Sequence, residues 1–304
     1  MKKSTSSDRL KTKPEALLKR WRYAIITPVK DEENYIENLI RSVINQTFLP
    51  VKWIIIDDGS QDATPQILRE YAEEYSFINV ITLPPERKRK PGGDTVFEIG
   101  LQQLNLNSID ILARIDADVT FDPDYIERMI EEFEKSPELG IASGEILEMI
   151  EGVPRHIPGP SFQTHGANKF YRVQCFRDIG GLDKQLGWDI VDNIKAMRKG
   201  WEARRIPHLF FVHHRPMGSS RNKWAAFVNW GKAAYLTGYH PLYFLSKFIF
   251  RIFTPPYLLG SLVMAYHYLS GFWRCDPRIV DDSTRKFIQK EQLKRLLRKK
   301  SKWD

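Results

Sequence analysis

The sequence contains only two cysteines among its 304 residues, Cys175 and Cys275. Two cysteines this far apart exclude a disulfide-rich scaffold and a cysteine-ligated zinc site. The first residues are charged and include no apolar stretch typical of a cleavable signal peptide. These absences favour a reducing compartment, and we expect a cytoplasmic protein. Hydrophobic residues make up 42% of the chain and charged residues 28%, which is typical of a globular protein and not of a disordered one.

The sequence also lacks an apolar segment of clear membrane-spanning length. Residues 252–273 include no Lys, Arg, Asp or Glu, but Pro255 and Pro256 interrupt this run near its start. The part that remains is shorter than the about 20 residues that a helix needs to cross a bilayer. Lys247 and Arg251 precede the run, and such cations extend to lipid headgroups. We expect helices that lie on the membrane surface. Packing on the rest of the protein, a dimer contact and a true crossing are the alternatives.

Basic residues concentrate at the two ends of the chain. The formal net charge is +8, and residues 1–22 and 274–304 each contribute +6, so the body between them is acidic. Basic flanks beside an apolar, aromatic segment favour contact with an anionic membrane surface over binding of nucleic acid. The alternative is that both ends are solvated tails.

Strand-like and helix-like segments alternate through the first half. Short runs rich in Val and Ile predict strands at 23–28, 51–56, 79–82, 109–115 and 140–143, and a later one at 208–212. Amphipathic segments predict helices at 31–45, 63–75, 96–105, 124–135 and 283–300, and the basic stretch 84–93 predicts a loop. This alternation indicates an α/β fold with a Rossmann-like, mostly parallel sheet flanked by helices, followed by a C-terminal helical appendage.

Polar and acidic side chains follow three of the early strands. They are Thr27 and Asp31 after the first strand, Asp57 and Asp58 after the second, and Asp116 and Asp118 after the fourth. Because ligands of open α/β sheets bind beyond the carboxyl ends of the strands, these side chains indicate a binding site. Asp116 and Asp118 could hold a hard divalent ion that neutralises a diphosphate leaving group, although acidic pairs also occur in solvated turns. No G-x-G-x-x-G follows the first strand, which argues against a dinucleotide-dependent oxidoreductase.

Three runs in this order, Ile25–Glu33, Ile54–Ser60 and Ile115–Asp118, resemble family-2 glycosyltransferases. Members of this family are inverting, nucleotide-sugar-dependent enzymes of GT-A fold, and the resemblance covers about 23–216. It implies a nucleotide pocket and a Mn or Mg site. The nucleotide-binding residues would be Thr27, Pro28, Asp31, Asp57, Asp58 and Asp116, with Asp58 the preferred partner of the base; the metal ligands would be Asp116, Asp118 and His213. Asp31 departs from the family, which usually has Asn there.

The acceptor half of the resemblance centres on Asp189. This residue lies eleven positions before Gly200, the family's usual spacing for the catalytic base, although Trp188 stands where the family more often has Glu. Asp192 is the fallback, and a helix cap is the structural alternative for either acid. A base is needed because the acceptor hydroxyl must lose its proton as it attacks the anomeric carbon.

Several other groups have weaker assignments. Arg215 could clamp a phosphate, and the cations of the loop at 85–93 could also meet the diphosphate. Residues 165–167 lie where the family lines the sugar pocket. The tail resembles the Q-x-x-R-W motif of processive synthases at 292–296, but it lacks the Trp, so we do not expect processive synthesis.

We therefore predict three regions: a basic N-terminal arm (1–22), a GT-A domain (23–216) with a nucleotide half (about 23–120) and an acceptor half (about 121–216), and C-terminal helices with a basic tail (217–304). The predicted function is metal-dependent, inverting transfer of one sugar from a nucleoside-diphosphate sugar to a hydroxyl of a glycan or lipid-linked acceptor, as in polysaccharide biosynthesis. The expected location is the cytoplasmic face of a membrane, with peripheral contact through the C-terminal segment and no nucleic-acid partner. Alternatives are a polyprenyl-phosphate sugar synthase and a non-catalytic nucleotide- or membrane-binding protein.

Overall fold

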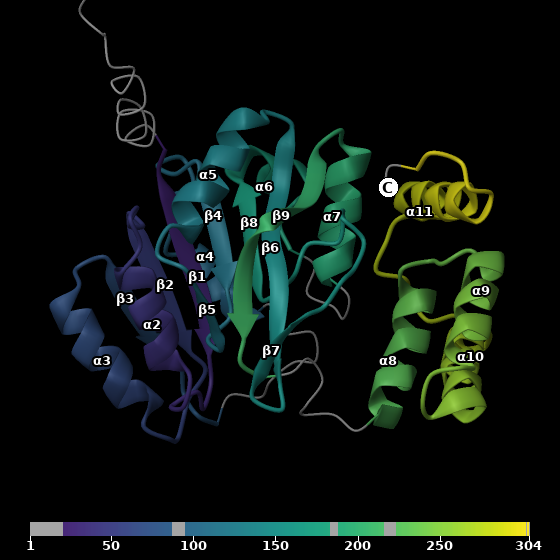
Figure 1. Ribbon diagram of the computed structural model, residues 1–304, viewed down its shortest axis with the longest axis horizontal. Coiled ribbons are helices and arrows are strands. Elements are labelled where there is room, and N and C mark those ends of the chain that lie inside the picture. The colour runs from purple at the N-terminus through teal and green to yellow at the C-terminus, as the bar shows by residue number, and fades with distance from the viewer. Residues whose placement is uncertain (1–20, 87–94, 183–187, 216–222, 302, 304) are drawn as a thin grey trace, which may run out of the picture.

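The computed structural model describes residues 21–86, 95–182, 188–215, 223–301 and 303. Residues 1–20 of the expected basic arm, most of the basic loop at 84–93 and Gly187 lie outside these residues. Figure 1 shows a central sheet with helices on both faces, and a group of helices beside it.

The first half forms the parallel part of the sheet. Its elements are β1 (Tyr23–Val29), α2 (Ile36–Ile44), β2 (Lys52–Asp57), α3 (Thr64–Glu74), β3 (Ile78–Thr82), α4 (Thr95–Leu101) and β4 (Ile111–Ile115). The strands lie in the order β3-β2-β1-β4, and all three pairings are parallel. This order confirms the expected α/β alternation, because β1, β2 and β3 are each followed by a helix that leads to the next parallel strand.

Alternate residues of the central strands supply two separate cores. Ile25 and Ile55 pack with α2 and α5 (Tyr125–Lys135) on one face, whereas Ile26, Ile54 and Ile56 pack with α4 and α7 (Trp188–Arg198) on the other. A strand buried on both faces reads as a continuous apolar run, which is why these strands were visible in the sequence.

Three helices are shorter than the sequence pattern predicted. α2 begins at Ile36 and not at Asp31, because Asp31 has a positive φ of 51° and residues 32–35 form a turn. α4 ends at Leu101, and a turn closed by the Ser108 N–H and the Asn105 carbonyl follows it. The tail helix ends at Leu296 and not at residue 300.

The second half extends the sheet with mixed pairing. Its elements are β5 (Val119–Phe121), α5 (Tyr125–Lys135), β6 (Leu139–Ile150), β7 (Val153–His156), β8 (Asn168–Arg172), α6 (Val173–Asp178), α7 (Trp188–Arg198) and β9 (Glu202–His213). β8 runs antiparallel to both β4 and β6, β9 is parallel to β6, and β5 is antiparallel to β9. The parallel expectation therefore holds for β1–β4, whereas among the strands that follow only β6 and β9 pair in parallel within the described residues.

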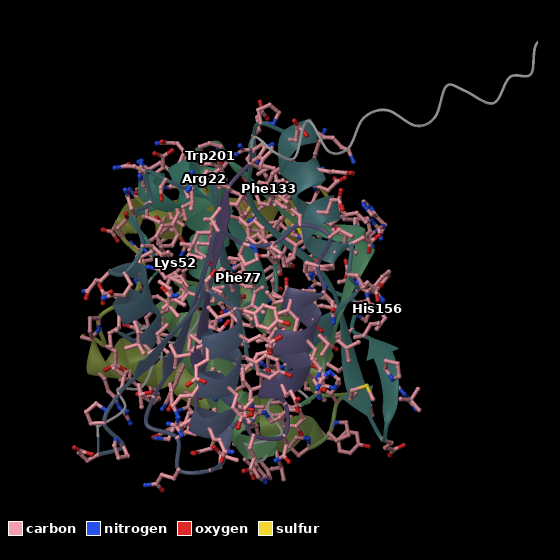
Figure 2. All side chains as sticks on the ribbon, turned by 90° about the vertical axis from the view of Figure 1, so that its left-hand side faces the viewer. Arg22, Lys52, Phe77, Phe133, His156 and Trp201 are labelled. Atoms are coloured by element: carbon pink, nitrogen blue, oxygen red, sulfur yellow. The ribbon has the colours of Figure 1, made fainter. Side chains whose placement is uncertain are left out.

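The sequence pattern did not predict β5, β7 and β8, and it predicted only parts of β6 and β9. All four residues of β7 are exposed, so this strand has no apolar signal; Figure 2 labels its His156 at the margin of the molecule. β8 carries the fully buried Lys169, which breaks the apolar run expected of a strand. β6 and β9 contain polar residues and register shifts that obscure their full length.

The C-terminal helices divide between two cores. They are α8 (Lys223–Leu236), α9 (Pro241–Arg251), α10 (Tyr257–Arg274) and α11 (Asp282–Leu296). α8, α9 and α10 share their own small core, and α10 packs against α8 so closely that a Cβ on Gly231 would lie 2.2 Å from the Met264 carbonyl oxygen. α11 and Trp303 belong instead to a core of the sheet domain, where the Trp303 ring stacks 5.0 Å from Phe162. The expected unit 217–304 is thus connected to the sheet domain through its last part.

α9 and α10 expose an unusually apolar face, which we call the α9–α10 face. Its exposed large residues are Leu242, Leu245, Ile249, Phe250, Phe253, Tyr257, Leu258, Leu259, Leu262, Tyr266, Leu269, Phe272 and Trp273. Within the described residues, no helix combines the length and the apolar character that crossing a bilayer demands.

Candidate functional site

The carboxyl ends of β1, β2 and β4 bring the predicted nucleotide-binding residues to one edge of the sheet. Thr27 pairs in register with Ile55, and Pro28 with Ile56, so both lie beside the end of β2. Thr27 is fully buried, and its Oγ1 accepts a hydrogen bond of 3.0 Å from Trp53 Nε1. Thr27 is therefore engaged by the core, and it shapes the floor of this edge.

One carboxylate oxygen of Asp57 could accept a further hydrogen bond. Its side chain is fully buried, and Oδ1 accepts a hydrogen bond of 2.8 Å from the Ser60 N–H. Asp57 Oδ2 is also buried and has no hydrogen-bond partner among the described residues. A buried carboxylate oxygen without a donor is costly, and the N–H group of a bound base would satisfy it. Asp58 follows directly and is nearly as buried.

Asp31 links the loops that follow β1 and β2. Its Oδ1 accepts a hydrogen bond of 2.8 Å from the Gln61 N–H, and its own N–H donates to Ser60 Oγ at 2.9 Å. Its left-handed backbone is a conformation that Asn and Asp adopt more readily than other non-glycine residues. This explains why Asp serves at a position where the resemblance led us to expect Asn.

The two aspartates of the D-x-D sequence lie beside cationic side chains. Arg114 Nη1 lies 3.1 Å from Asp116 Oδ1, and His213 Nε2 lies 3.3 Å from Asp118 Oδ1. Arg215 Nε donates to Asp118 Oδ2 at 3.0 Å, and Nη2 lies 3.0 Å from the same oxygen and also contacts Glu32. Of the three predicted metal ligands, Asp118 and His213 are therefore in direct contact, while Asp116 is paired with Arg114.

The charges in this cluster shift the pKa values of its members. Burial disfavours the charged form of His213, but its hydrogen bond to Asp118 and the nearby carboxylates outweigh burial and raise its pKa. Burial likewise opposes ionisation of Asp118, yet His213 and Arg215 hold its pKa below the usual value. Burial raises the pKa of Glu32, and Arg215 offsets only part of that effect. The contact between Asp118 and His213 thus favours the charged form of each partner.

The donor chemistry of Asp116, Asp118 and His213 fits a hard divalent ion, because carboxylate oxygens with one imidazole are ligands that Mg²⁺ or Mn²⁺ accepts. Among the described residues, no three His, Cys, Asp or Glu side chains are already gathered as a metal cluster. Both oxygens of Asp118 are instead occupied by cationic side chains. Binding of an ion would therefore replace some of these contacts.

The two candidate bases differ in their surroundings. Asp192 is 1% exposed, and both of its oxygens lie 2.8 Å from the Lys169 ammonium, while Tyr171 donates to Oδ2 at 2.6 Å. Asp189 is partly exposed in the first turn of α7, and its carbonyl accepts a hydrogen bond of 2.7 Å from Lys169. Asp192 is occupied as a structural acceptor, which favours Asp189 as the base.

The segment at 165–167 lies directly beside the D-x-D sequence. The Asp116 N–H donates to the Ala167 carbonyl at 2.8 Å, and Arg114 Nη1 donates to the Gly166 carbonyl at 2.6 Å. Burial, helped by the charges of Arg205 and other cations, lowers the pKa of His165 to about 3. Residues 165–167 thus adjoin the D-x-D sequence, and the imidazole of His165 is neutral.

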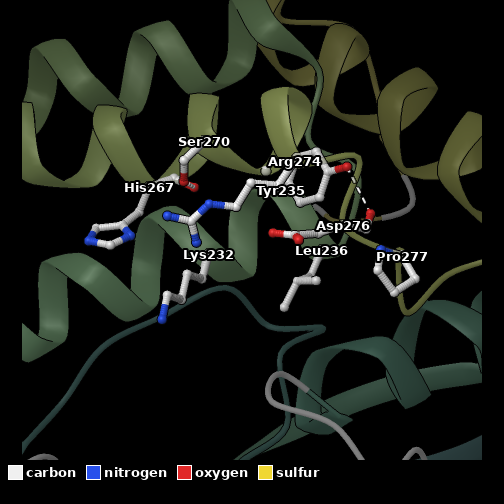
Figure 3. A pocket seen from close by; sticks show the side chains of 9 residues that line it. Lys232, Tyr235, Leu236, His267, Ser270, Arg274, Asp276 and Pro277 are labelled. Carbon is white, nitrogen blue, oxygen red and sulfur yellow. Dashed lines mark hydrogen bonds between the residues drawn. The ribbon is translucent and has the colours of Figure 1, made fainter.

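A separate hollow of 330 Å³ lies between α8 and α10 and is not part of the strand-end site (Figure 3). Its lining residues are Lys232, Tyr235, Leu236, His267, Ser270, Gly271, Arg274, Asp276 and Pro277. None of the predicted site residues lines it.

The reasoning from sequence missed Glu32, Arg114 and Lys169. Arg114 and Lys169 had a usable signal, since a charged residue inside an otherwise apolar strand needs a buried partner. Glu32 stands in an acidic run that looked like a helix start, so nothing distinguished it.

Comparison with known proteins identifies the family. The model of glycosyl transferase family 2 matches residues 24–176, half of the chain. An uncharacterized glycosyltransferase of Haemophilus influenzae is 32% identical over 141 residues, 46% of this chain and 41% of that protein. The succinoglycan biosynthesis protein ExoA of Rhizobium meliloti is 26% identical over 185 residues, 53% of each chain. The chain thus matches about half or less of the length of these relatives.

The fold has solved counterparts. The mannosyltransferase PcManGT from Pyrobaculum calidifontis, in complex with GDP-Man and Mn²⁺, is similar with a TM-score of 0.53, covering 83% of this chain and 71% of that one. At 18% identity this likeness concerns the fold alone, and it confirms the expected GT-A class. The chain belongs to glycosyl transferase family 2.

The buried pair of Lys169 and Asp192 gives a first prediction. Lys169→Met leaves the Asp192 carboxylate buried without its cation, and we expect a loss of about 3–5 kcal/mol in the free energy of unfolding. The double variant with Asp192→Asn removes the unpaired charge and should recover most of that loss. Denaturant unfolding of both variants and the wild type measures this, and a loss below about 1 kcal/mol in Lys169→Met would contradict it.

His165 gives a prediction of pH dependence. Its pKa is about 3 in the folded protein and about 6.5 when unfolded, so the unfolded chain binds the extra proton between these values. The stability that the neutral ring contributes is complete above pH 6.5 and is lost as the pH falls toward 3. We expect the wild type to lose about 2 kcal/mol more than His165→Gln between pH 7 and pH 4.5. The exposed His208→Gln variant is the control, and equal pH profiles for all three proteins would refute the prediction.

Proposed function

We propose that this protein is a metal-dependent, inverting glycosyltransferase that moves one sugar from a nucleoside-diphosphate sugar to a hydroxyl of a glycan or lipid-linked acceptor. The observation that carries the proposal is the gathering of Asp57, Asp58, Asp116, Asp118 and His213 at the carboxyl edge of one sheet. Membership of glycosyl transferase family 2 supports the reaction class.

The nucleotide would bind at the ends of β1 and β2. Asp57 Oδ2 has no partner among the described residues and would accept a hydrogen bond from the base, with Asp58 beside it. Pro28 and the loop that Asp31 anchors would form the wall of the pocket. PcManGT was solved with GDP-Man, which supports a nucleotide-sugar donor for this chain.

Asp116, Asp118 and His213 would hold a Mn or Mg ion. When bound, the ion would supply positive charge that stabilises the diphosphate leaving group. Asp116 also adjoins the proposed sugar-pocket segment, because its N–H donates to the Ala167 carbonyl. The Mn²⁺ in the PcManGT structure supports this choice of ion.

Asp189 would act as the general base. Its carboxylate would take the proton of the acceptor hydroxyl while that oxygen bonds to the anomeric carbon and the bond to the diphosphate breaks on the opposite face. This direct displacement inverts the configuration. ExoA acts in succinoglycan biosynthesis, which supports an acceptor of the polysaccharide type.

The GT-A domain and the C-terminal region would have different roles. Residues 23–216 would carry the transferase, with the donor on the nucleotide half and Asp189 on the acceptor half. Residues 217–304 would attach the enzyme to a membrane surface.

The function is tested by calorimetric titration with nucleoside diphosphates, with and without Mn²⁺. We expect one of them to bind in a metal-dependent manner, with affinity reduced at least tenfold in Asp118→Ala because a ligand is lost. Asp189→Asn should bind the nucleotide normally but lower kcat by about 10²–10⁴-fold, because the general base is absent. The exposed Asp124→Asn is the matched control.

Two outcomes would contradict this assignment. A folded protein that binds no nucleoside diphosphate would exclude a nucleotide-sugar donor. Full activity in Asp189→Asn would favour transfer to polyprenyl phosphate, since such an acceptor is already anionic and needs no base.

We also propose that the α9–α10 face binds an anionic bilayer from the cytoplasmic side, as a peripheral contact. Residues 241–274 contain no Asp or Glu, whereas Lys247, Arg251 and Arg274 provide positive charge. The Arg251 guanidinium lies over the Trp230 ring at 3.4 Å from its centroid, at the edge of this face. Exposed aromatic residues with flanking cations are typical of helices that lie in the membrane interface.

Vesicle sedimentation tests the membrane contact. The full-length wild type should bind vesicles containing phosphatidylglycerol more tightly than neutral ones, and binding should weaken with added salt. Phe250, Phe253 and Trp273 are at least 70% exposed, and replacing all three by Ser should reduce binding at least tenfold because apolar area is lost. Val153→Ser on β7 is the control. No binding by the wild type, or a dimer that the triple variant dissociates, would overturn the proposal.

A further inference from the structure

Arg215 connects two acidic side chains that come from distant parts of the chain. It follows the end of β9, and its Nε and Nη2 both lie 3.0 Å from Asp118 Oδ2, while Nη2 also contacts Glu32 Oε1. Its guanidinium carbon lies 5.8 Å from the centroid of the Tyr35 ring. The guanidinium group therefore bridges the D-x-D sequence and the turn before α2.

The backbone and the burial of Glu32 hold its carboxylate in contact with this arginine. Its N–H donates to Thr64 Oγ1 at 2.8 Å, which fixes the backbone, and its side chain is only 10% exposed. Glu32 Oε2 is buried and has no hydrogen-bond partner among the described residues. A buried carboxylate in this state needs a nearby cation, and Arg215 is the one that contacts it.

Arg215 and a divalent ion would compete for the same carboxylate. His213 occupies Oδ1 of Asp118, and Arg215 occupies Oδ2. An ion that binds through Asp118 would have to displace one of these contacts, and it would repel a guanidinium group that stayed in place.

Arg215 is also suited to move from the carboxylates to the diphosphate of the nucleotide sugar. Its side chain is 42% exposed, so it can rotate away from the carboxylates toward solvent. Arginine binds phosphate oxygens with two parallel hydrogen bonds, which a diphosphate offers and a single shared carboxylate oxygen does not.

We propose that Arg215 is a diphosphate-binding residue that Asp118 and Glu32 hold while the site is empty. It exchanges these carboxylates for the diphosphate as the metal ion takes Asp118. This inference rests on the proposed function. When Arg215 leaves Asp118 for the diphosphate, it frees a carboxylate for the metal ion. The metal ion and the diphosphate therefore bind with positive coupling, so each binds more tightly when the other is present.

Calorimetry on the full chain tests the proposal with Mn²⁺ and pyrophosphate, which isolates the diphosphate from recognition of the base. In Arg215→Gln, Mn²⁺ alone should bind about tenfold more tightly, because its competitor is gone, while pyrophosphate with Mn²⁺ should bind about tenfold more weakly, because a charged donor is lost. In Glu32→Gln, pyrophosphate alone should bind several-fold more tightly, because Arg215 is released. Arg128→Gln, which removes a surface ion pair with Asp124, is the control.

The results separate this inference from the proposed function. If the wild type binds Mn²⁺ and a nucleoside diphosphate but Arg215→Gln changes neither affinity, Arg215 is a structural bridge and the inference is wrong. Weakening of both ligands in Arg215→Gln would also overturn it, because an exchange demands opposite signs. A folded wild type that binds neither ligand refutes the proposed function itself, and the inference falls with it. Thermal unfolding of each variant verifies that it is folded.

Discussion

Parallel strands deliver their carboxylates to the same edge of the sheet, and these like charges would repel one another strongly in a partly buried site. Arg114 offsets Asp116, and His213 and Arg215 offset Asp118. His213 and Arg215 come from the end of β9, which reaches this edge through its pairings with β5 and β6. The mixed second half of the sheet is therefore what supplies counter-charge to the acids of the parallel first half.

β8 connects this edge of the sheet to the acceptor half, where Asp189 and Asp192 lie. It pairs with β4, so that Lys169 stands opposite Arg114, and the carbonyl of Ala167, the residue just before β8, accepts a hydrogen bond from the Asp116 N–H. The buried ammonium of Lys169 then reaches the Asp189 carbonyl and the Asp192 carboxylate in α7. This short strand therefore links the D-x-D sequence to the helix that carries the candidate base. The links are the hydrogen bond between Asp116 and Ala167 and the contacts of Lys169 with α7.

The sequence predicted the features that local pattern controls. Strands buried on both faces appear as apolar runs such as 54–56, and acids after those runs marked the edge of the sheet where Asp57 and Asp118 lie. It could not predict which cations would neutralise the acids, because Arg215 and Glu32 are 183 positions apart and only the closed sheet brings them together. It also missed β7, whose exposed residues have no hydrophobic period, and β8, whose Lys169 contradicts the apolar rule for buried strands.

The C-terminal helices relate to the site through charge as well as packing. α11 and Trp303 share a core with the sheet domain, which holds the helical group against α7. Burial raises the pKa of Tyr239, at the turn between α8 and α9, to about 12, and the charge of Asp189 contributes to that increase. The candidate base therefore lies within electrostatic reach of the helices that expose the α9–α10 face. If that face binds a membrane, a lipid-linked acceptor would approach Asp189 from the side of the C-terminal helices, where Tyr239 lies within its electrostatic reach.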